Sequence, residues 1–265
     1  MTSLKCGDTE ILWQKNPEVW NSTAPILFPI CGRLWDNKYL YNGQEFQMGI
    51  HGFIRFSEFD IDEITSDSVT LSTNHTPKTK EQYPFDFTFR VKFTLEDNKV
   101  NIFYQVTNND SKEMFFSVGG HEGFACPEGV EDYELEFPDD EFIIRRILSE
   151  GFFNGEEEKI CLNNHKLALK YDEFERCTYI LRLPKSKNII LCNKSRTVNV
   201  GLGNSTCVAL WTLQDRKYLC IEAWCGCSET EGYVKNISEK EGIICIKSNE
   251  TFSHEHSISV PNVSE

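Results

Sequence analysis

The chain has 265 residues, of which 40% are hydrophobic and 26% charged, a composition typical of a globular protein. Lys and Arg number 27 against 41 Asp and Glu, which gives a net charge of −14. This acidic balance argues against nucleic acid or an anionic membrane as partner, because both need clustered Lys and Arg. The start of the chain lacks a signal-peptide pattern, and no apolar run approaches the ~20 residues of a membrane helix, so we expect a cytoplasmic protein.

The strongest hydrophobic periodicity is two, which indicates β-strands. In chain order, short strands are expected at 68–72, 87–95, 100–106, 133–137, 188–192, 208–212, 218–224, 242–247 and 254–260. The polar residues 96–99 predict a tight hairpin between the second and third of these. The best helix candidate is the short segment 141–148, whereas 172–175 is too polar to need a core. Many short strands favour a single all-β domain spanning 1–265, built as an antiparallel sandwich or barrel.

The eleven cysteines are irregularly spaced and include no Cys-x-x-Cys pair, so neither a zinc ribbon nor a redox motif is predicted. We expect reduced thiols, many of them buried as small hydrophobes. His254 and His256 lie two apart and share one strand face, which is a possible metal pair. No third ligand lies nearby in sequence, so an exposed terminal strand is the favoured interpretation and no metal is expected.

Ionisable residues stand beside glycines or inside apolar runs at four places. His121 follows Gly119-Gly120 at the end of an apolar stretch, and imidazole is suited to proton transfer near neutral pH. Glu222 interrupts a second apolar run, where desolvation should raise the pKa of its carboxyl. Arg33 and the pair His51 and Arg55 lie at two further bends. Each residue alone is more simply structural, and the spacing does not show that they meet.

Together these segments resemble the aldose 1-epimerase (galactose mutarotase-like) superfamily, especially its compact mutarotase-like branch. The resemblance extends from about Pro25 to Ile258, and its order and spacing are more specific than any one motif. The matching segments are Leu27-Phe28-Pro29-Ile30-Cys31-Gly32-Arg33, Met48-Gly49-Ile50-His51-Gly52-Phe53-Ile54-Arg55, Tyr83-Pro84-Phe85, Phe116-Ser117-Val118-Gly119-Gly120-His121, Cys220-Ile221-Glu222-Ala223-Trp224-Cys225-Gly226, Glu239-Lys240-Glu241-Gly242-Ile243 and Asn249-Glu250-Thr251-Phe252.

The resemblance implies a large, twisted antiparallel β-sandwich with a sugar-sized cleft on one sheet. It implies that His121 is the general acid and Glu222 the general base, with Arg33 and His51 positioning the substrate. Trp211 or Trp224 is a candidate platform for a sugar face, although core positions for both are at least as plausible. Arg55 is a candidate phosphate contact because its guanidinium is a planar fork. Better-known relatives carry a further acidic residue in the cleft, and no clear counterpart occurs around 174–179, which includes Glu175 and Cys177.

The leading hypothesis is an isomerase, an aldose 1-epimerase that interconverts the α and β anomers of a hexose or hexose phosphate. The chemistry needs one acid and one base and no cofactor or metal. The expected partner is a small-molecule sugar, and the chain is expected to be a monomer or homodimer. The alternatives are a non-catalytic carbohydrate-binding protein that keeps the cleft, and an epimerase-like protein that acts on a modified sugar.

Overall fold

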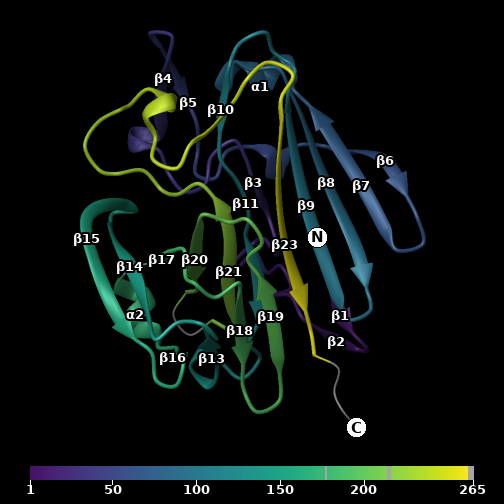
Figure 1. Cartoon of the computed structure of the whole chain (residues 1–265), viewed down its shortest axis with the longest axis vertical. Helices are drawn as coiled ribbons and strands as arrows, with labels where there is room; N and C mark the ends of the chain where they lie inside the picture. Colours follow the sequence, from purple (N-terminus) through teal and green to yellow (C-terminus); the bar gives the residue numbers. More distant parts are fainter. Residues whose placement is uncertain (177, 214–215, 262–265) are drawn as a thin grey trace.

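The structure is a computed structural model that describes residues 1–176, 178–213 and 216–261. Within these residues, eight strands form one antiparallel sheet in the order β15-β14-β17-β20-β21-β11-β3, with β12 also paired to β21 (Figure 1). We call it the site sheet. Its strands are β3 Ile26–Leu27, β11 Val118–Gly120, β12 Glu122–Ala125, β14 Phe142–Ser149, β15 Phe152–Cys161, β17 Tyr179–Arg182, β20 Cys207–Trp211 and β21 Tyr218–Cys225.

A second, nine-stranded antiparallel sheet has the order β16-β13-β18-β19-β23-β9-β8-β7-β6 over the same described residues. We call it the far sheet, and its strands β23, β9, β8 and β7 run side by side in Figure 1. Its strands are β6 Asp60–Ile64, β7 Ser68–Asn74, β8 Phe87–Glu96, β9 Lys99–Asn108, β13 Glu134–Glu136, β16 Lys166–Ala168, β18 Asn188–Cys192, β19 Thr197–Gly201 and β23 Thr251–Ser259.

The remaining elements are short. Three two-stranded ladders are β1 Lys5–Cys6 with β2 Thr9–Glu10, β4 Lys38–Tyr41 with β5 Gln44–Gln47, and β10 Met114–Phe116 with β22 Ile244–Ile246. The helices are α1 Pro77–Gln82 and α2 Tyr171–Arg176, with 3-10 turns η1 Trp35–Asn37, η2 Ile54–Phe56, η3 Val130–Asp132 and η4 Ile237–Glu239. In the described parts of the chain, no helix is long and apolar enough to cross a membrane.

The two large sheets pack face to face, which confirms the predicted all-β sandwich. Buried side chains of both sheets, such as Phe89 and Tyr104 from the far sheet and Leu210 and Ile221 from the site sheet, belong to one apolar cluster. The predicted hairpin is β8 and β9, and every other expected strand overlaps an observed one. Strand β21 is buried along its whole length, because the two sheets' core covers one face and loops cover the other.

Three expectations about local structure were wrong. The segment 141–148 is not a helix but most of β14, in which Ile143 and Arg145 are buried and their neighbours are not. This period-two burial suits the β-branched isoleucines of the segment. The segment 172–175 lies in the helix α2, and Phe174 anchors that helix on the core.

The third correction concerns the terminal strand. His254 and His256 are 0% and 2% exposed, so β23 does not present them to solvent. Their imidazoles face the space between the two sheets, where His256 Nε2 lies 3.0 Å from Glu122 Oε1. Polar residues are tolerated there because they are paired with one another.

Candidate active site

The strand register places the two predicted proton-transfer residues opposite each other. In β11, Gly119 pairs with Trp224, and in β12, Glu122 pairs with Ile221. The same antiparallel register places His121, which lies between β11 and β12, across from Glu222 of β21. Their side chains share the outer face of the site sheet, and His121 Nε2 lies 3.4 Å from Glu222 Oε1. We call these two residues the acid–base pair.

A cavity of about 420 Å³ opens above the acid–base pair on the outer face of the site sheet. This volume lies within the range of small-molecule sites. The floor continues across β20 and β17, since Ala209 of β20 pairs with Glu222 and Ile180 of β17 pairs with Ala209. The lining residues are Trp20, Gly32, Arg33, Ile50, His51, Arg55, His121, Leu148, Glu150, Gly151, Thr178, Ile180, Trp211, Glu222, Trp224 and Ser228. All seven candidate residues from the sequence therefore meet in one cavity.

Tryptophan rings form the walls of the cavity. Trp20 stacks on His121 with ring centroids 5.2 Å apart and meets Trp211 edge-on at 5.6 Å. Trp211 in turn contacts His121 edge-on at 5.8 Å. Flat apolar surfaces of this kind suit the apolar faces of a sugar ring. Sequence reasoning missed Trp20, because it lies in an N-terminal segment without hydrophobic periodicity.

His51 is buried at the cavity edge in a turn that its neighbour makes possible. A Cβ on Gly52, whose φ is +66°, would lie 2.3 Å from the carbonyl oxygen of Phe28, so only glycine fits there. The amide of Gly32 donates to His51 Nδ1 over 3.1 Å. Burial, then the nearby His121, Arg55 and Arg33, hold the pKa of His51 well below its usual value. His51 is therefore neutral, with its proton on Nε2, and can donate to a hydroxyl.

Two arginines lie on the rim of the cavity. Arg33 follows β3, is exposed, and lies against the β14–β15 turn at Gly151. Arg55 lies in η2, where its Nη2 donates to the carbonyl of Ile50 over 2.9 Å and its guanidinium stacks on Phe56. The Nε of Arg55 is buried without a hydrogen-bond partner among the described residues. Both guanidinium groups thus border the cavity and keep unused hydrogen-bonding capacity.

A further carboxylate reaches the cavity from an unexpected element. Around 174–179, Thr178 lines the cavity, whereas Cys177 lies outside the described residues. The second lining carboxylate beside Glu222 belongs instead to Glu150, in the turn between β14 and β15. No pattern in the sequence indicated this carboxylate, because the segment before it was predicted to be helical.

Burial pushes both members of the acid–base pair toward their neutral forms. Burial lowers the pKa of His121 to about 4, with the Glu122 carboxylate acting in the opposite direction. Burial, and then the charge of Glu122, raise the pKa of Glu222 well above its usual range. A neutral imidazole beside a protonated carboxyl holds the same number of protons as an imidazolium beside a carboxylate, one more than a neutral imidazole beside a carboxylate. The pair is therefore one that shares a single mobile proton.

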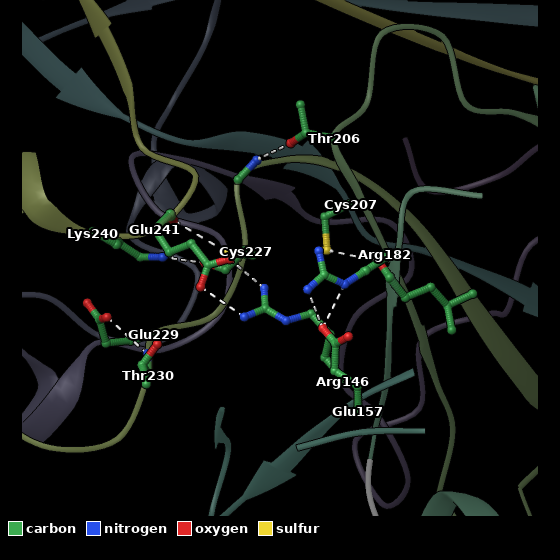
Figure 2. A network of polar contacts seen from close by, with 12 residues as sticks. Arg146, Glu157, Arg182, Thr206, Cys207, Cys227, Glu229, Thr230, Lys240 and Glu241 are labelled. Carbon is green, nitrogen blue, oxygen red and sulfur yellow. Dashed lines mark hydrogen bonds and ion pairs between the residues drawn. The ribbon is translucent and has the colours of Figure 1, made fainter. Parts of the chain in front are cut away.

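Polar contacts fasten the loop after β21 beside the cavity (Figure 2). Arg146 of β14 forms a bidentate ion pair with Glu241, at 2.7 and 2.9 Å. Lys240, 3% exposed, donates its ammonium to the carbonyl oxygen of Cys227. Ser228, which follows Cys227 in the chain, lines the cavity. This network of contacts therefore sets the position of one cavity wall.

The chain matches known proteins along nearly its whole length. The family model for aldose 1-epimerase matches residues 1–259. The plasmid-encoded protein LacX of Lactococcus lactis subsp. lactis is 31% identical, over 99% of this chain and 93% of its own. A galactose mutarotase related enzyme from Lactobacillus acidophilus has a TM-score of 0.92 at 29% identity, covering 97% of this chain and 89% of its own. A galactose mutarotase-like protein from Lactobacillus casei ATCC 334 has the same fold, with a TM-score of 0.89 at 22% identity and coverage of 96% and 90%. The resemblance seen in the sequence is thereby confirmed, and the chain belongs to the aldose 1-epimerase family.

Proposed function

We propose that this protein is a mutarotase that interconverts the α and β anomers of a hexose or hexose phosphate. The observation that supports this most directly is the acid–base pair, buried, 3.4 Å apart, and open to a cavity of about 420 Å³. Mutarotation needs one group that takes the proton of the anomeric hydroxyl and another that protonates the ring oxygen. These two oxygens share one carbon atom, so the two protein groups must also be neighbours.

In the proposed mechanism, Glu222 as carboxylate takes the proton of the anomeric hydroxyl while His121 as imidazolium protonates the ring oxygen. Ring opening leaves Glu222 protonated and His121 neutral. Rotation about the C1–C2 bond then exposes the other face of the aldehyde, and closure runs both transfers backwards. The pair thus shares the same single mobile proton before and after ring opening. Its ion-pair tautomer carries out ring opening, and its neutral tautomer carries out ring closure.

The surroundings of the pair support this cycle. Burial disfavours an isolated charge on either member, so the ion-pair and neutral tautomers are brought closer in energy than they are in water. His51 donates from Nε2 and can hold a sugar hydroxyl, while Trp20 and Trp211 confine the ring. For a phosphate at the far end of a hexose phosphate, exposed Arg33 is better placed than the candidate Arg55, because Arg55 Nη2 already donates to the carbonyl oxygen of Ile50.

The test is anomer exchange of glucose, galactose and glucose 6-phosphate, measured by polarimetry and by NMR exchange spectroscopy. With the sugar that the wild type accelerates, His121→Asn and Glu222→Gln should each lower the rate by ~10²–10⁴-fold. Matched controls are His75→Asn, directly after β7, and Glu63→Gln, in β6, which change the same residue types away from the cavity and should leave the rate unchanged.

Wild-type rates in both site variants would refute the assigned roles. A wild-type protein that binds one of these sugars without accelerating anomer exchange would refute the enzyme and favour the carbohydrate-binding alternative.

A further inference from the structure

A third side chain that can bind a metal ion lies against the acid–base pair: the thiol of Cys220, which is fully buried and which the proposed mechanism does not use. Cys220 stands two residues before Glu222 on β21, so both side chains project from the same face of the site sheet. One ligand atom each of His121, Cys220 and Glu222 lies within 4.8 Å of the other two. We propose that these three residues form a binding site for a zinc-like divalent cation, and that the bound ion blocks sugar turnover.

The geometry is close to that of a tetrahedral site. Zinc binds histidine nitrogen and carboxylate oxygen at about 2.0–2.2 Å and thiolate at about 2.3 Å, so ligand atoms on one ion are about 3.3–3.6 Å apart. His121 Nε2 and Glu222 Oε1 already lie 3.4 Å apart. The ligand atoms lie within 4.8 Å of one another, so the Cys220 sulfur must approach the other two by at most about 1.2–1.5 Å. A side-chain rotation on a fixed strand is enough for such a shift.

The site is also chemically unsatisfied. His121 is 8% exposed and Glu222 2%, yet His121 Nδ1 and Glu222 Oε2 have no hydrogen-bond partner among the described residues. These are the second polar atoms of the two side chains, not the Nε2 and Oε1 that lie 3.4 Å apart, and a buried polar atom without a partner calls for an explanation such as a function or an absent ligand. Nitrogen and sulfur ligands favour zinc, cobalt and copper over magnesium or calcium, which prefer oxygen.

The cavity supplies the remaining coordination position. Three protein ligands and one open position is the coordination pattern of catalytic zinc sites, in contrast to closed structural sites with four protein ligands. Water or a sugar hydroxyl would occupy the fourth position from the cavity. On binding, the Cys220 thiol releases its proton to solvent and the metal–sulfur bond forms.

Occupation of the site would prevent proton transfer directly. The metal takes the lone pair of the His121 nitrogen and an oxygen of Glu222, the atoms that must exchange protons with the sugar. The ion would therefore act as a reversible inhibitor that competes with substrate. This second half of the proposal rests on the proposed mutarotase function, whereas metal binding itself does not.

The decisive measurement uses Co²⁺ and Zn²⁺ with the metal-free full chain. Co²⁺ should give a cobalt–thiolate charge-transfer band in the near ultraviolet and the visible bands of a tetrahedral site, and Zn²⁺ should abolish both. Calorimetry with Zn²⁺ should show that Cys220→Ser weakens binding by more than about tenfold. Two matched controls, Cys126→Ser at a buried position and Cys161→Ser at an exposed one, should bind as the wild type does.

Zn²⁺ should also suppress anomer exchange, and removal of the ion with EDTA should restore it. The rate of each variant with Zn²⁺ is compared with the rate of the same variant without metal. Suppression should need more than about tenfold more Zn²⁺ in Cys220→Ser. A Co²⁺ spectrum of the wild type without a cobalt–thiolate band would overturn the proposed metal site. This test is made on the wild type alone and so does not depend on whether a variant folds. Unchanged affinity in Cys220→Ser, or lost affinity in Cys161→Ser, would overturn it as well. If the metal-free chain accelerates no anomer exchange, the mutarotase proposal fails while the spectra and calorimetry still decide the metal site.

Discussion

Gly123 determines where the Trp20 ring can lie, and a single methyl group there tests how tightly the cavity wall is held. An ideal Cβ on Gly123 would lie 2.5 Å from Trp20 Cζ3 and 3.3 Å from the carbonyl oxygen of Thr23, whereas ordinary contacts begin at 3.4 Å. The ring must therefore move by about 0.9 Å, the difference between 3.4 and 2.5 Å. Its stacking on His121 and on Tyr218, both at 5.2 Å, opposes that movement.

We expect Gly123→Ala to lower the free energy of unfolding by about 1–3 kcal/mol, the usual cost of overpacking. The backbone contributes nothing to this cost, because Gly123 lies in β12 without a positive φ. Urea denaturation measures the effect. Gly49→Ala is the matched control, since its Cβ would meet nothing within 4 Å and its φ is not positive.

A double-mutant cycle separates the Trp20 clash from any other cause. In a Trp20→Ala background the ring is gone, so Gly123→Ala should cost less than about 0.5 kcal/mol. An equal cost in both backgrounds would refute the argument, because the penalty would then not come from Trp20. The displaced ring should also lower the rate of anomer exchange in Gly123→Ala, since Trp20 covers His121.

Two further predictions concern charge. Burial, and then the neighbouring His256, lower the pKa of His254 to about 3, so its protonation favours the unfolded chain, where the value is 6.5. This contribution to stability is present above pH 6.5 and is lost as the pH falls; it should amount to about 1.5 kcal/mol between pH 6.5 and 5. Denaturation at the two pH values should show a smaller loss for His254→Gln, and an identical loss would contradict the argument. Separately, Arg33→Gln should slow anomer exchange of glucose 6-phosphate by about tenfold with little effect on glucose. Equal effects on both sugars would show that Arg33 does not contact the phosphate.

The sequence predicted the strands better than it predicted what surrounds them. Alternation located β8, β9 and β21 because one or both faces of these strands are buried, and burial is what hydrophobic periodicity records. The same signal failed for 141–148, where arginines alternate with isoleucines and one of them, Arg145, is fully buried. An ion pair at 3.3 Å to Glu173 of α2 permits that burial, and pairing partners are not visible in a local pattern.

The same limit applies to the candidate site, where local patterns located residues but not the contacts between them. His121 was singled out after two glycines at the end of an apolar stretch and Glu222 inside an apolar run, and the resemblance gave them their expected roles, but only the register of β11 and β12 on β21 shows that they meet. Trp20 and Glu150 were missed because they come from a segment without periodicity and from a turn. Positions in such segments depend on tertiary contacts, and a single sequence does not encode those contacts in any local spacing.

The residue after His121 connects the cavity with the interior of the sandwich. Glu122 points away from the cavity and pairs with His256 of the far sheet, 3.0 Å away, so a buried carboxylate lies directly behind the acid–base pair. Burial alone would lower the pKa of His121 and raise that of Glu222, and the charge of Glu122 raises both. A negative charge behind the sheet therefore favours the protonated form of either partner and helps the pair to keep its one proton at neutral pH. In the proposed mutarotase cycle, His256 of the terminal strand therefore acts on the cavity from the opposite side of the site sheet, because it pairs with the Glu122 carboxylate whose charge acts through that sheet.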